Sequence, residues 1–280
     1  MSEGQESAQA FVPGHVTGFF SAYPHDDPER AGSRGGGVTL TDGVSVTVKQ
    51  AAETSVSLNG KPLAVEAVTE VLAALGATAR VRAETPLPLG AGFGVSGAMA
   101  LGTALAANDV FGCDRSENEL VTVAHAADVR AGSGLGDVVA QARGGVPIRL
   151  EPGGPAHNRL DGVPASARVE YLVLGELSTE DVLSGDTEQL SLAGEEALST
   201  LVARPTMAVF MRASRQFARE AGLLTPDVEA VISNVERAGG AASMAMLGET
   251  VFAFGTALSD AGYNATACHT HAAGATLRLE

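Results

Sequence analysis

The stretch Pro86-Leu-Pro-Leu-Gly-Ala-Gly-Phe-Gly-Val-Ser-Gly-Ala98 decides how the rest of this sequence is interpreted. Its three alternating glycines, Gly90, Gly92 and Gly94, come directly before an apolar run, residues 95–108, that predicts a helix. Glycine leaves out the side chain where a backbone must approach a ligand closely. The first turn of a helix adds unpaired N–H groups and a partial positive charge. The stretch therefore predicts a loop and helix start that bind phosphate.

Two common classes of phosphate-binding loop match this stretch poorly. A P-loop requires a Lys-Ser or Lys-Thr pair after its last glycine, and neither Lys49 nor Lys61 stands in such a pair. The dinucleotide fingerprint G-x-G-x-x-G is matched by residues 92–97. However, residues 85–89, with two prolines, separate it from the strand predicted at residues 79–84. A nicotinamide-dependent oxidoreductase and a non-catalytic nucleotide-binding regulator remain as alternatives on this evidence.

A third class fits better, because the pattern Pro-x-x-x-Gly-x-Gly-x-Gly-x-Ser-x-Ala resembles the ATP-binding motif of the GHMP kinase superfamily. That motif usually ends Gly-Leu-Gly-Ser-Ser-Ala-Ala. This chain has Phe93 in place of Leu, Val95 in place of the first Ser and Gly97 in place of an Ala, but retains Ser96. The resemblance implies that ATP is bound by Pro88, Gly90, Ala91, Gly92, Phe93, Gly94, Val95, Ser96, Gly97 and Ala98.

Composition and charge exclude several other classes of protein. A 280-residue chain with 45% hydrophobic residues is long and apolar enough to bury a substantial core. Its 33 acidic and 18 basic residues give a net charge of −15, which disfavours nucleic acid and anionic membranes as partners. We expect a cytoplasmic protein, since the two cysteines are far apart and neither a signal peptide nor a membrane-spanning run is evident.

The first half of the chain alternates strand and helix patterns. Thr41-Asp42-Gly43 lies between two apolar runs, Val38–Leu40 and Val44–Val48, and predicts a hairpin turn. Ser116 and Glu119 have the spacing of a capping box, which predicts a helix over residues 117–130.

The second half follows a different order of elements. Residues 151–164 are rich in glycine and proline and predict a linker. From the strand predicted at residues 168–174 onward, the order is β-α-β-β-α-β with extra helices, as in the ferredoxin-like fold. We therefore expect an α+β protein with an N-terminal domain at residues 1–155 and a ferredoxin-like C-terminal domain at 156–280. The two-domain GHMP kinase architecture implies the same division.

The resemblance also implies roles for three polar side chains. Phosphoryl transfer requires a held triphosphate, neutralised charge and a positioned acceptor hydroxyl. Asp137 closes Gly132-Ser-Gly-Leu-Gly-Asp137, which is similar to the segment that supplies the family's catalytic aspartate. Ser96 and Asp128 correspond to the positions whose oxygens bind Mg²⁺, although Asp128 lies slightly closer to Asp137 than is usual in the family. ATP and Mg²⁺ are thus the expected substrate and cofactor.

Four stretches resemble one branch of the superfamily, the archaeal pantoate kinase family: residues 12–20, 32–38, 92–98 and 243–248. The resemblance implies ATP-dependent phosphorylation of pantoate, a hydroxy acid, in coenzyme A biosynthesis, and it allows a homodimer. Homoserine, shikimate and mevalonate kinases are the alternatives. We expect His15, which replaces a basic residue of the family's first motif, and Arg34 to bind the substrate. An arginine suits its carboxylate, and Arg130 and Arg143 are the next candidates.

Overall fold

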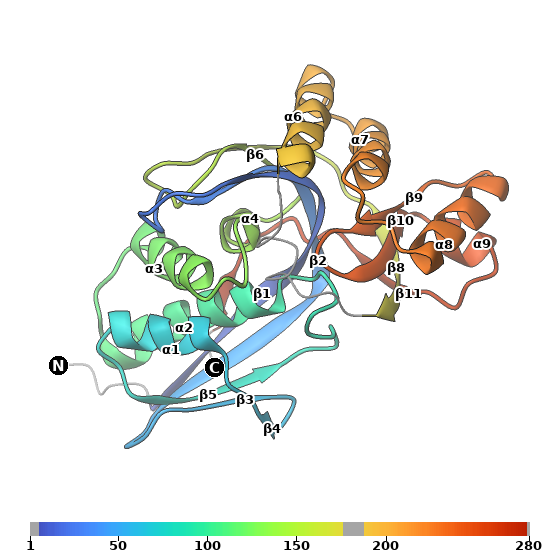
Figure 1. Cartoon of the computed structure of the whole chain (residues 1–280). Helices are drawn as coiled ribbons and strands as arrows, with labels where there is room; N and C mark the ends of the chain where they lie inside the picture. The colour runs from blue at the N-terminus through green and yellow to red at the C-terminus, as the bar shows by residue number, and fades with distance from the viewer. Residues whose placement is uncertain (1–5, 176–187, 279–280) are drawn as a thin grey trace.

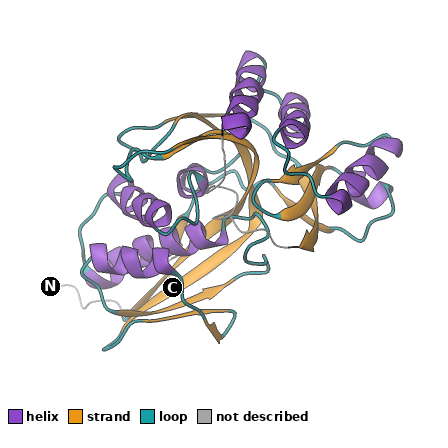
Figure 2. Ribbon diagram, viewed as in Figure 1, coloured by secondary structure: helices purple, strands orange, loops and turns teal. Residues whose placement is uncertain are grey.

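A computed structural model describes residues 6–175 and 188–278 of the chain. Figures 1 and 2 show two β-sheets, a larger one covered by helices on one face and a smaller one that carries its own helices. The expected α+β class is confirmed. In the described residues, the larger sheet has eight strands and the smaller sheet has four.

The larger sheet is built on two long antiparallel strands, β1 (Ser7–Tyr23) and β2 (Gly32–Gln50). β1 was not predicted, because most of its side chains are buried and it therefore lacks alternation between apolar and polar residues. The other strands of this sheet are β3 (Ser55–Leu58), β4 (Lys61–Pro62), β5 (Ala79–Glu84), β6 (Pro147–Glu151), β7 (Arg159–Gly162) and β12 (Thr276–Arg278).

The predicted hairpin turn at Thr41-Asp42-Gly43 is wrong. β2 continues through these residues as one strand, and its register against β1 shifts there, with Pro13 opposite Gly43 and Gly14 opposite Leu40. β1 is long enough to pair with both halves of β2, so the backbone stays extended. The additional residues Thr41 and Asp42 are accommodated as a β-bulge.

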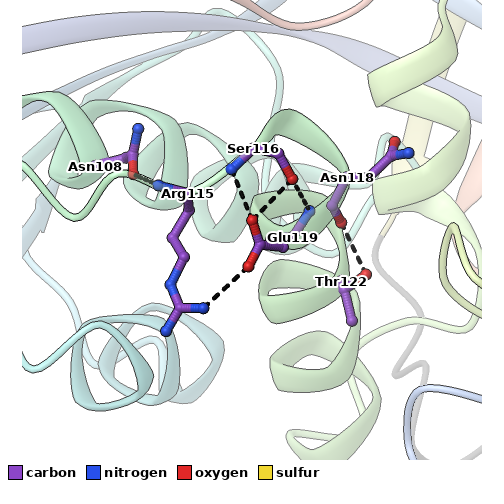
Figure 3. Close-up of polar contacts among 6 residues, drawn as sticks. All are labelled: Asn108, Arg115, Ser116, Asn118, Glu119 and Thr122. Carbon is purple, nitrogen blue, oxygen red and sulfur yellow. Dashed lines mark hydrogen bonds and ion pairs between the residues drawn. The ribbon is translucent and has the colours of Figure 1, made fainter.

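Together with the larger sheet, four helices of the described residues form the first structural unit: α1 (Glu66–Ala74), α2 (Val95–Phe111), α3 (Glu117–Arg130) and α4 (Asp137–Arg143). α2 packs on β1 and β2 and is flanked by α1 and α3. The capping box is confirmed: the Ser116 hydroxyl accepts from the Glu119 N–H, and the Glu119 carboxylate accepts from the Ser116 N–H at 2.9 Å (Figure 3). The hydrogen bond from the Ser116 N–H, together with those that the Ser116 hydroxyl and Arg115 donate to the same carboxylate, lowers the pKa of Glu119 to about 2.

The second unit has the strand order of a ferredoxin-like sheet, β11-β8-β10-β9, with every neighbouring pair antiparallel. This prediction is confirmed. Of its helices, α8 and α9 pack on the sheet, while α7 also contacts β1 and α6 packs on β1 and β2. The elements are β8 (Arg168–Gly175), α6 (Glu188–Ala203), α7 (Met207–Glu220), α8 (Pro226–Arg237), β9 (Ala242–Ala245), β10 (Glu249–Phe254), α9 (Ala257–Asp260) and β11 (Thr266–His269).

The two sheets do not separate along the chain at residue 155. The predicted linker at residues 151–164 contains β7, which pairs with β6, and β12 pairs with β1 in the larger sheet. Glycines and prolines at 152–155 serve the turn between β6 and β7 instead of a linker. Across residues 6–175 and 188–278, none of the helices has the length and apolar character needed to cross a membrane.

Candidate functional site

A cavity of about 330 Å³ lies where three segments meet: the glycine loop (residues 90–94), the start of α2 and a second glycine loop (residues 132–136). Residues from opposite ends of the chain line it, among them Thr17 of β1, Ser96 of α2, Asp137 of α4 and Leu247 after β9. Leu247 has a φ of +65°, an uncommon backbone conformation for a side chain of this size. The cavity is therefore formed jointly by both structural units.

The start of α2 presents unpaired N–H groups to this cavity. Gly94 is the N-cap, with a left-handed φ of +62°, and within the described structure no side chain caps the helix. The first N–H groups of a helix have no partner within it, and Gly94, Val95 and Ser96 line the cavity. A Cβ at position 94 would lie 3.0 Å from the Asp137 carboxyl carbon. The loop thus brings N–H groups that can donate hydrogen bonds to a phosphate close to the side chain of Asp137.

Asp137 and His15 form a short hydrogen bond at the edge of the cavity. The Nδ1–H of His15 donates to Asp137 Oδ1 at 2.6 Å, and His15 is fully buried. β2 passes directly over the imidazole at Gly37, where a Cβ would lie 2.1 Å from His15 Nε2. Burial lowers the pKa of His15, against the opposing effect of Asp137. A neutral imidazole therefore orients the carboxylate.

Arg149 of β6 is a buried cation near Asp137. Its side chain is 1% exposed, and among the described residues its Nε and Nη1 atoms have no hydrogen-bond partner. Burial lowers its pKa to about 10, with Asp137 opposing the shift, so the guanidinium stays charged at neutral pH. A second cavity of about 20 Å³, lined by both residues, adjoins Thr17 and Leu247 of the larger cavity.

These neighbours determine the charge of Asp137. Burial alone would raise the pKa of this carboxyl group, but the hydrogen bond from His15 and the positive charge of Arg149 outweigh it and lower the pKa. Asp137 is therefore an ionised base held in a fixed orientation beside the start of α2. A carboxylate in that state can orient a hydroxyl group and accept its proton.

Asp128 lies deeper, behind the second glycine loop. Its Oδ1 accepts a 2.6 Å hydrogen bond from the Ser133 hydroxyl, and burial raises its pKa to about 7 despite that bond. Its Oδ2 faces the helix start, since a Cβ on Gly97 would lie 3.2 Å away. With the Ser96 hydroxyl, it gives two oxygen atoms near the glycine loop that could bind a metal ion.

These donors fit a magnesium ion that takes its remaining ligands from phosphate and water, as Mg²⁺ usually does. The part of the chain that the structure describes contains no cluster of three or more His, Cys, Asp or Glu side chains able to hold a metal by themselves. The described side chains thus supply only some of the ligands that a magnesium ion requires.

The structure brings together most, though not all, of the residues singled out from the sequence. Six of the proposed ATP-binding residues line the larger cavity: Gly90, Gly92, Phe93, Gly94, Val95 and Ser96. The other four lie in the same segment but not among the lining residues: Pro88, Ala91, Gly97 and Ala98. His15, Asp137 and Asp128 lie together beside this segment.

The arginines are placed differently from expectation. Arg34 donates to Glu195 at 2.6 Å and to the Leu150 carbonyl at 2.8 Å, and it does not line the larger cavity. Arg149, which sequence reasoning missed, is the cation beside Asp137. A signal for it was present, because Arg149 is the one charged residue in the apolar run of residues 146–150.

Comparisons with known proteins find relatives that match most of the chain. The profile of the GHMP kinases N terminal domain matches residues 62–145. The chain is 34% identical over 261 residues to pantoate kinase of Thermococcus kodakarensis, covering 88% of this chain and 86% of that protein. It is 33% identical over 257 residues to pantoate kinase of Methanospirillum hungatei, with the same coverage.

Solved structures show the same architecture. A structure described as a phosphotransferase related to the CoA biosynthesis pathway superposes with a TM-score of 0.86 at 29% identity, covering 97% of this chain and 98% of that one. Homoserine kinase from Cytophaga hutchinsonii superposes with a TM-score of 0.70 at 19% identity over 99% of each chain. The latter likeness shows the fold alone.

The contact between His15 and Asp137 leads to a direct prediction. Replacing His15 with Leu removes the hydrogen bond that lowers the pKa of Asp137, so we expect that pKa to rise. The measurement is the pH titration of the ¹³C-labelled Asp137 carboxyl group by NMR. His271→Leu, at a half-buried histidine whose ring packs on Phe11, is the matched control and should leave the titration unchanged. An unaltered pKa in His15→Leu would contradict the role of His15.

Proposed function

The chain belongs to the pantoate kinases of the GHMP kinase superfamily, and from this premise we propose that it phosphorylates the 4-hydroxyl group of (R)-pantoate with ATP. The product is 4-phosphopantoate, an intermediate of archaeal coenzyme A biosynthesis. The observation that carries the proposal is the buried guanidinium of Arg149, whose Nε and Nη1 atoms have no hydrogen-bond partner among the described residues, beside the ionised carboxylate of Asp137. Together they fit an acceptor that has both a carboxylate and a hydroxyl group.

The glycine loop and the start of α2 bind the triphosphate. Their N–H groups supply donors without adding side-chain bulk, and the positive end of α2 favours the negative charge of the phosphates. A low-dielectric cavity strengthens both effects. The γ-phosphate therefore lies near Gly94 and Ser96, on the side of the cavity that approaches Asp137.

Asp137 orients the acceptor hydroxyl and accepts its proton. The hydroxyl oxygen forms a bond to the γ-phosphorus, the bond from that phosphorus to the β,γ-bridging oxygen breaks, and ADP leaves with the electron pair. His15 keeps Asp137 oriented through its 2.6 Å hydrogen bond. Positioning and charge stabilisation provide most of the catalysis in such a transfer.

Ser96 and Asp128 are the residues that would hold Mg²⁺, which would neutralise charge on the phosphates when bound. Asp128 is 2% exposed and its carboxyl group has a raised pKa. A nearby divalent cation favours the ionised form of such a carboxyl group. Ser96 lies in the first turn of α2 and lines the larger cavity, and Oδ2 of Asp128 approaches Gly97 of the same turn, which supports this assignment.

Arg149 binds the carboxylate of pantoate. A guanidinium fork matches a carboxylate in shape and charge, and the free Nε and Nη1 atoms leave this capacity unused within the described residues. Arg34 already donates to Glu195 and to a backbone carbonyl, which makes it the weaker candidate. The cytoplasmic location and a homodimer stay predictions.

A comparison of acceptors tests the proposed activity. We expect ADP release with Mg²⁺ and ATP to depend on pantoate and to be far slower with homoserine, shikimate or mevalonate. Phosphorus NMR of the product should show a new phosphate monoester on the primary alcohol. Preference for another of these acceptors would replace pantoate as the substrate while keeping the kinase activity.

Asp137→Asn tests the proton acceptor. The substitution keeps the size of the side chain but removes its negative charge and most of its basicity. We expect kcat to fall roughly 10²–10⁴-fold, with ATP affinity nearly unchanged. Isothermal titration with ATP and steady-state kinetics provide the two measurements. A variant with normal turnover but a lower melting temperature would show that Asp137 is a structural residue.

Arg149→Met tests the carboxylate contact. Loss of a charge-assisted hydrogen bond of about 1.5–3 kcal/mol should raise KM for pantoate roughly 10- to 150-fold, with a smaller effect on KM for ATP. Arg34→Met is the matched control, because its ion pair with Glu195 lies outside the cavity. A larger pantoate KM in Arg34→Met than in Arg149→Met would reverse the two assignments.

A further inference from the structure

The bulge in β2 is a point at which the two sheets are joined. The Thr41 hydroxyl accepts a 3.1 Å hydrogen bond from the His269 N–H of β11. Its neighbour Asp42 accepts a 2.9 Å hydrogen bond from the hydroxyl of Tyr171 in β8. Both acceptors are the residues that the register shift adds to β2, so the irregularity itself supplies the polar contacts.

Tyr171 also contacts the glycine loop. Its ring meets the ring of Phe93 edge to face, with the centroids 4.9 Å apart and the planes at 65°. Both side chains are buried, at 4% and 1% exposure. Phe93 lies between Gly92 and Gly94, and its carbonyl oxygen accepts a 3.0 Å hydrogen bond from the His15 N–H. The ring of Phe93 is thus held from the second unit and its backbone from the first.

We propose that Tyr171 is a positioning residue for the nucleotide, because Asp42 fixes its hydroxyl and its ring fixes Phe93 within the phosphate-binding loop. The inference rests on the proposed binding of ATP by that loop. The loop needs external support, because its alternating glycines have more backbone freedom than any other residue. The orientation of the loop N–H groups therefore depends on the side chain of Phe93 and on the residues that pack against it.

The hydroxyl of Tyr171 is the informative part of this chain of contacts. A Phe at position 171 would fill the same space beside Phe93, so packing alone does not require Tyr. A hydrogen bond to a carboxylate is stronger than one to a neutral acceptor and is directional. The bond between Tyr171 and Asp42 thereby restricts the orientation of the ring that packs against Phe93. A second bond, from the Thr250 hydroxyl to the Ala91 carbonyl at 2.8 Å, holds the preceding turn of the loop.

Tyr171→Phe tests the role of the hydroxyl. We expect KM for ATP to rise about 3- to 10-fold, with kcat and KM for pantoate changing less than about twofold. Tyr263→Phe is the matched control: it also loses a partly buried hydroxyl contact, with Asn234 at 2.5 Å, but it has no contact with the glycine loop. Both variants should lose some thermal stability, and the rise in KM for ATP should occur in Tyr171→Phe alone.

Phe93→Leu tests the other end of the contact without touching the hydroxyl. It should also raise KM for ATP. The rise in KM in the double variant with Tyr171→Phe should be smaller than the product of the two single rises, because both substitutions weaken the same contact between Tyr171 and Phe93. Unchanged KM for ATP in Tyr171→Phe, an equal rise in Tyr263→Phe, or fully multiplicative effects would each overturn the proposal.

Gly94→Val distinguishes this inference from the proposed function. A side chain at this left-handed position would crowd Asp137 and Gln141, and ATP binding measured by titration should be lost. Retained ATP binding in a folded Gly94→Val protein would remove the glycine loop as the ATP site, and the role of Tyr171 with it. Loss of binding in Gly94→Val together with normal KM for ATP in Tyr171→Phe would overturn the role of Tyr171 alone.

Discussion

A carboxylate that is both buried and ionised places strict demands on its surroundings, and Asp137 is such a group. Desolvation favours its neutral form, so the ionised form exists only because His15 and Arg149 supply a hydrogen bond and a positive charge. These three residues come from α4, β1 and β6, which must therefore meet at one point. The long β1–β2 pair, on which β6 and α4 also pack, brings them together.

Other features of the fold follow from the same requirement. His15 can lie flat under β2 only because position 37 has no side chain. The helix start near Asp137 stays accessible because Gly94 provides the N-cap by its backbone conformation instead of by a side chain. Both features lower the free energy of unfolding, because glycine is unfavourable within a strand and a helix start without a side-chain cap is less stable. The proposed roles of Asp137 and the glycine loop would account for these costs.

The sequence predicted the parts of the structure that depend on local pattern. The glycine loop, α2, the capping box of α3 and the ferredoxin-like order are encoded by spacing, caps and turns, and each was found in the structure. The grouping of His15, Asp128 and Asp137 beside the loop was anticipated from the resemblance to a family of kinases.

Features that depend on distant partners could not be predicted in this way. Asp42-Gly43 has the local chemistry of a hairpin turn, and only the length of β1 turns it into a bulge. Arg34 lies in a glycine-rich segment that suggests a ligand, yet Glu195, 161 residues away, accepts its hydrogen bond. Arg149 carries a signal, a charge within an apolar strand, but its meaning depends on Asp137 lying beside it.

The pairing of β12 with β1 has a consequence for how the molecule is made. Gln9 lies opposite Arg278, so the outer edge of β1 gains this neighbour only after the chain has been synthesised as far as Arg278. Until then, the N–H and C=O groups of Gln9–Phe11 on this edge of β1 lack their partner strand, and an unpaired strand edge favours pairing between chains. Because contacts so distant in sequence form slowly, synthesis of this protein includes an interval in which the nascent chain is exposed to aggregation.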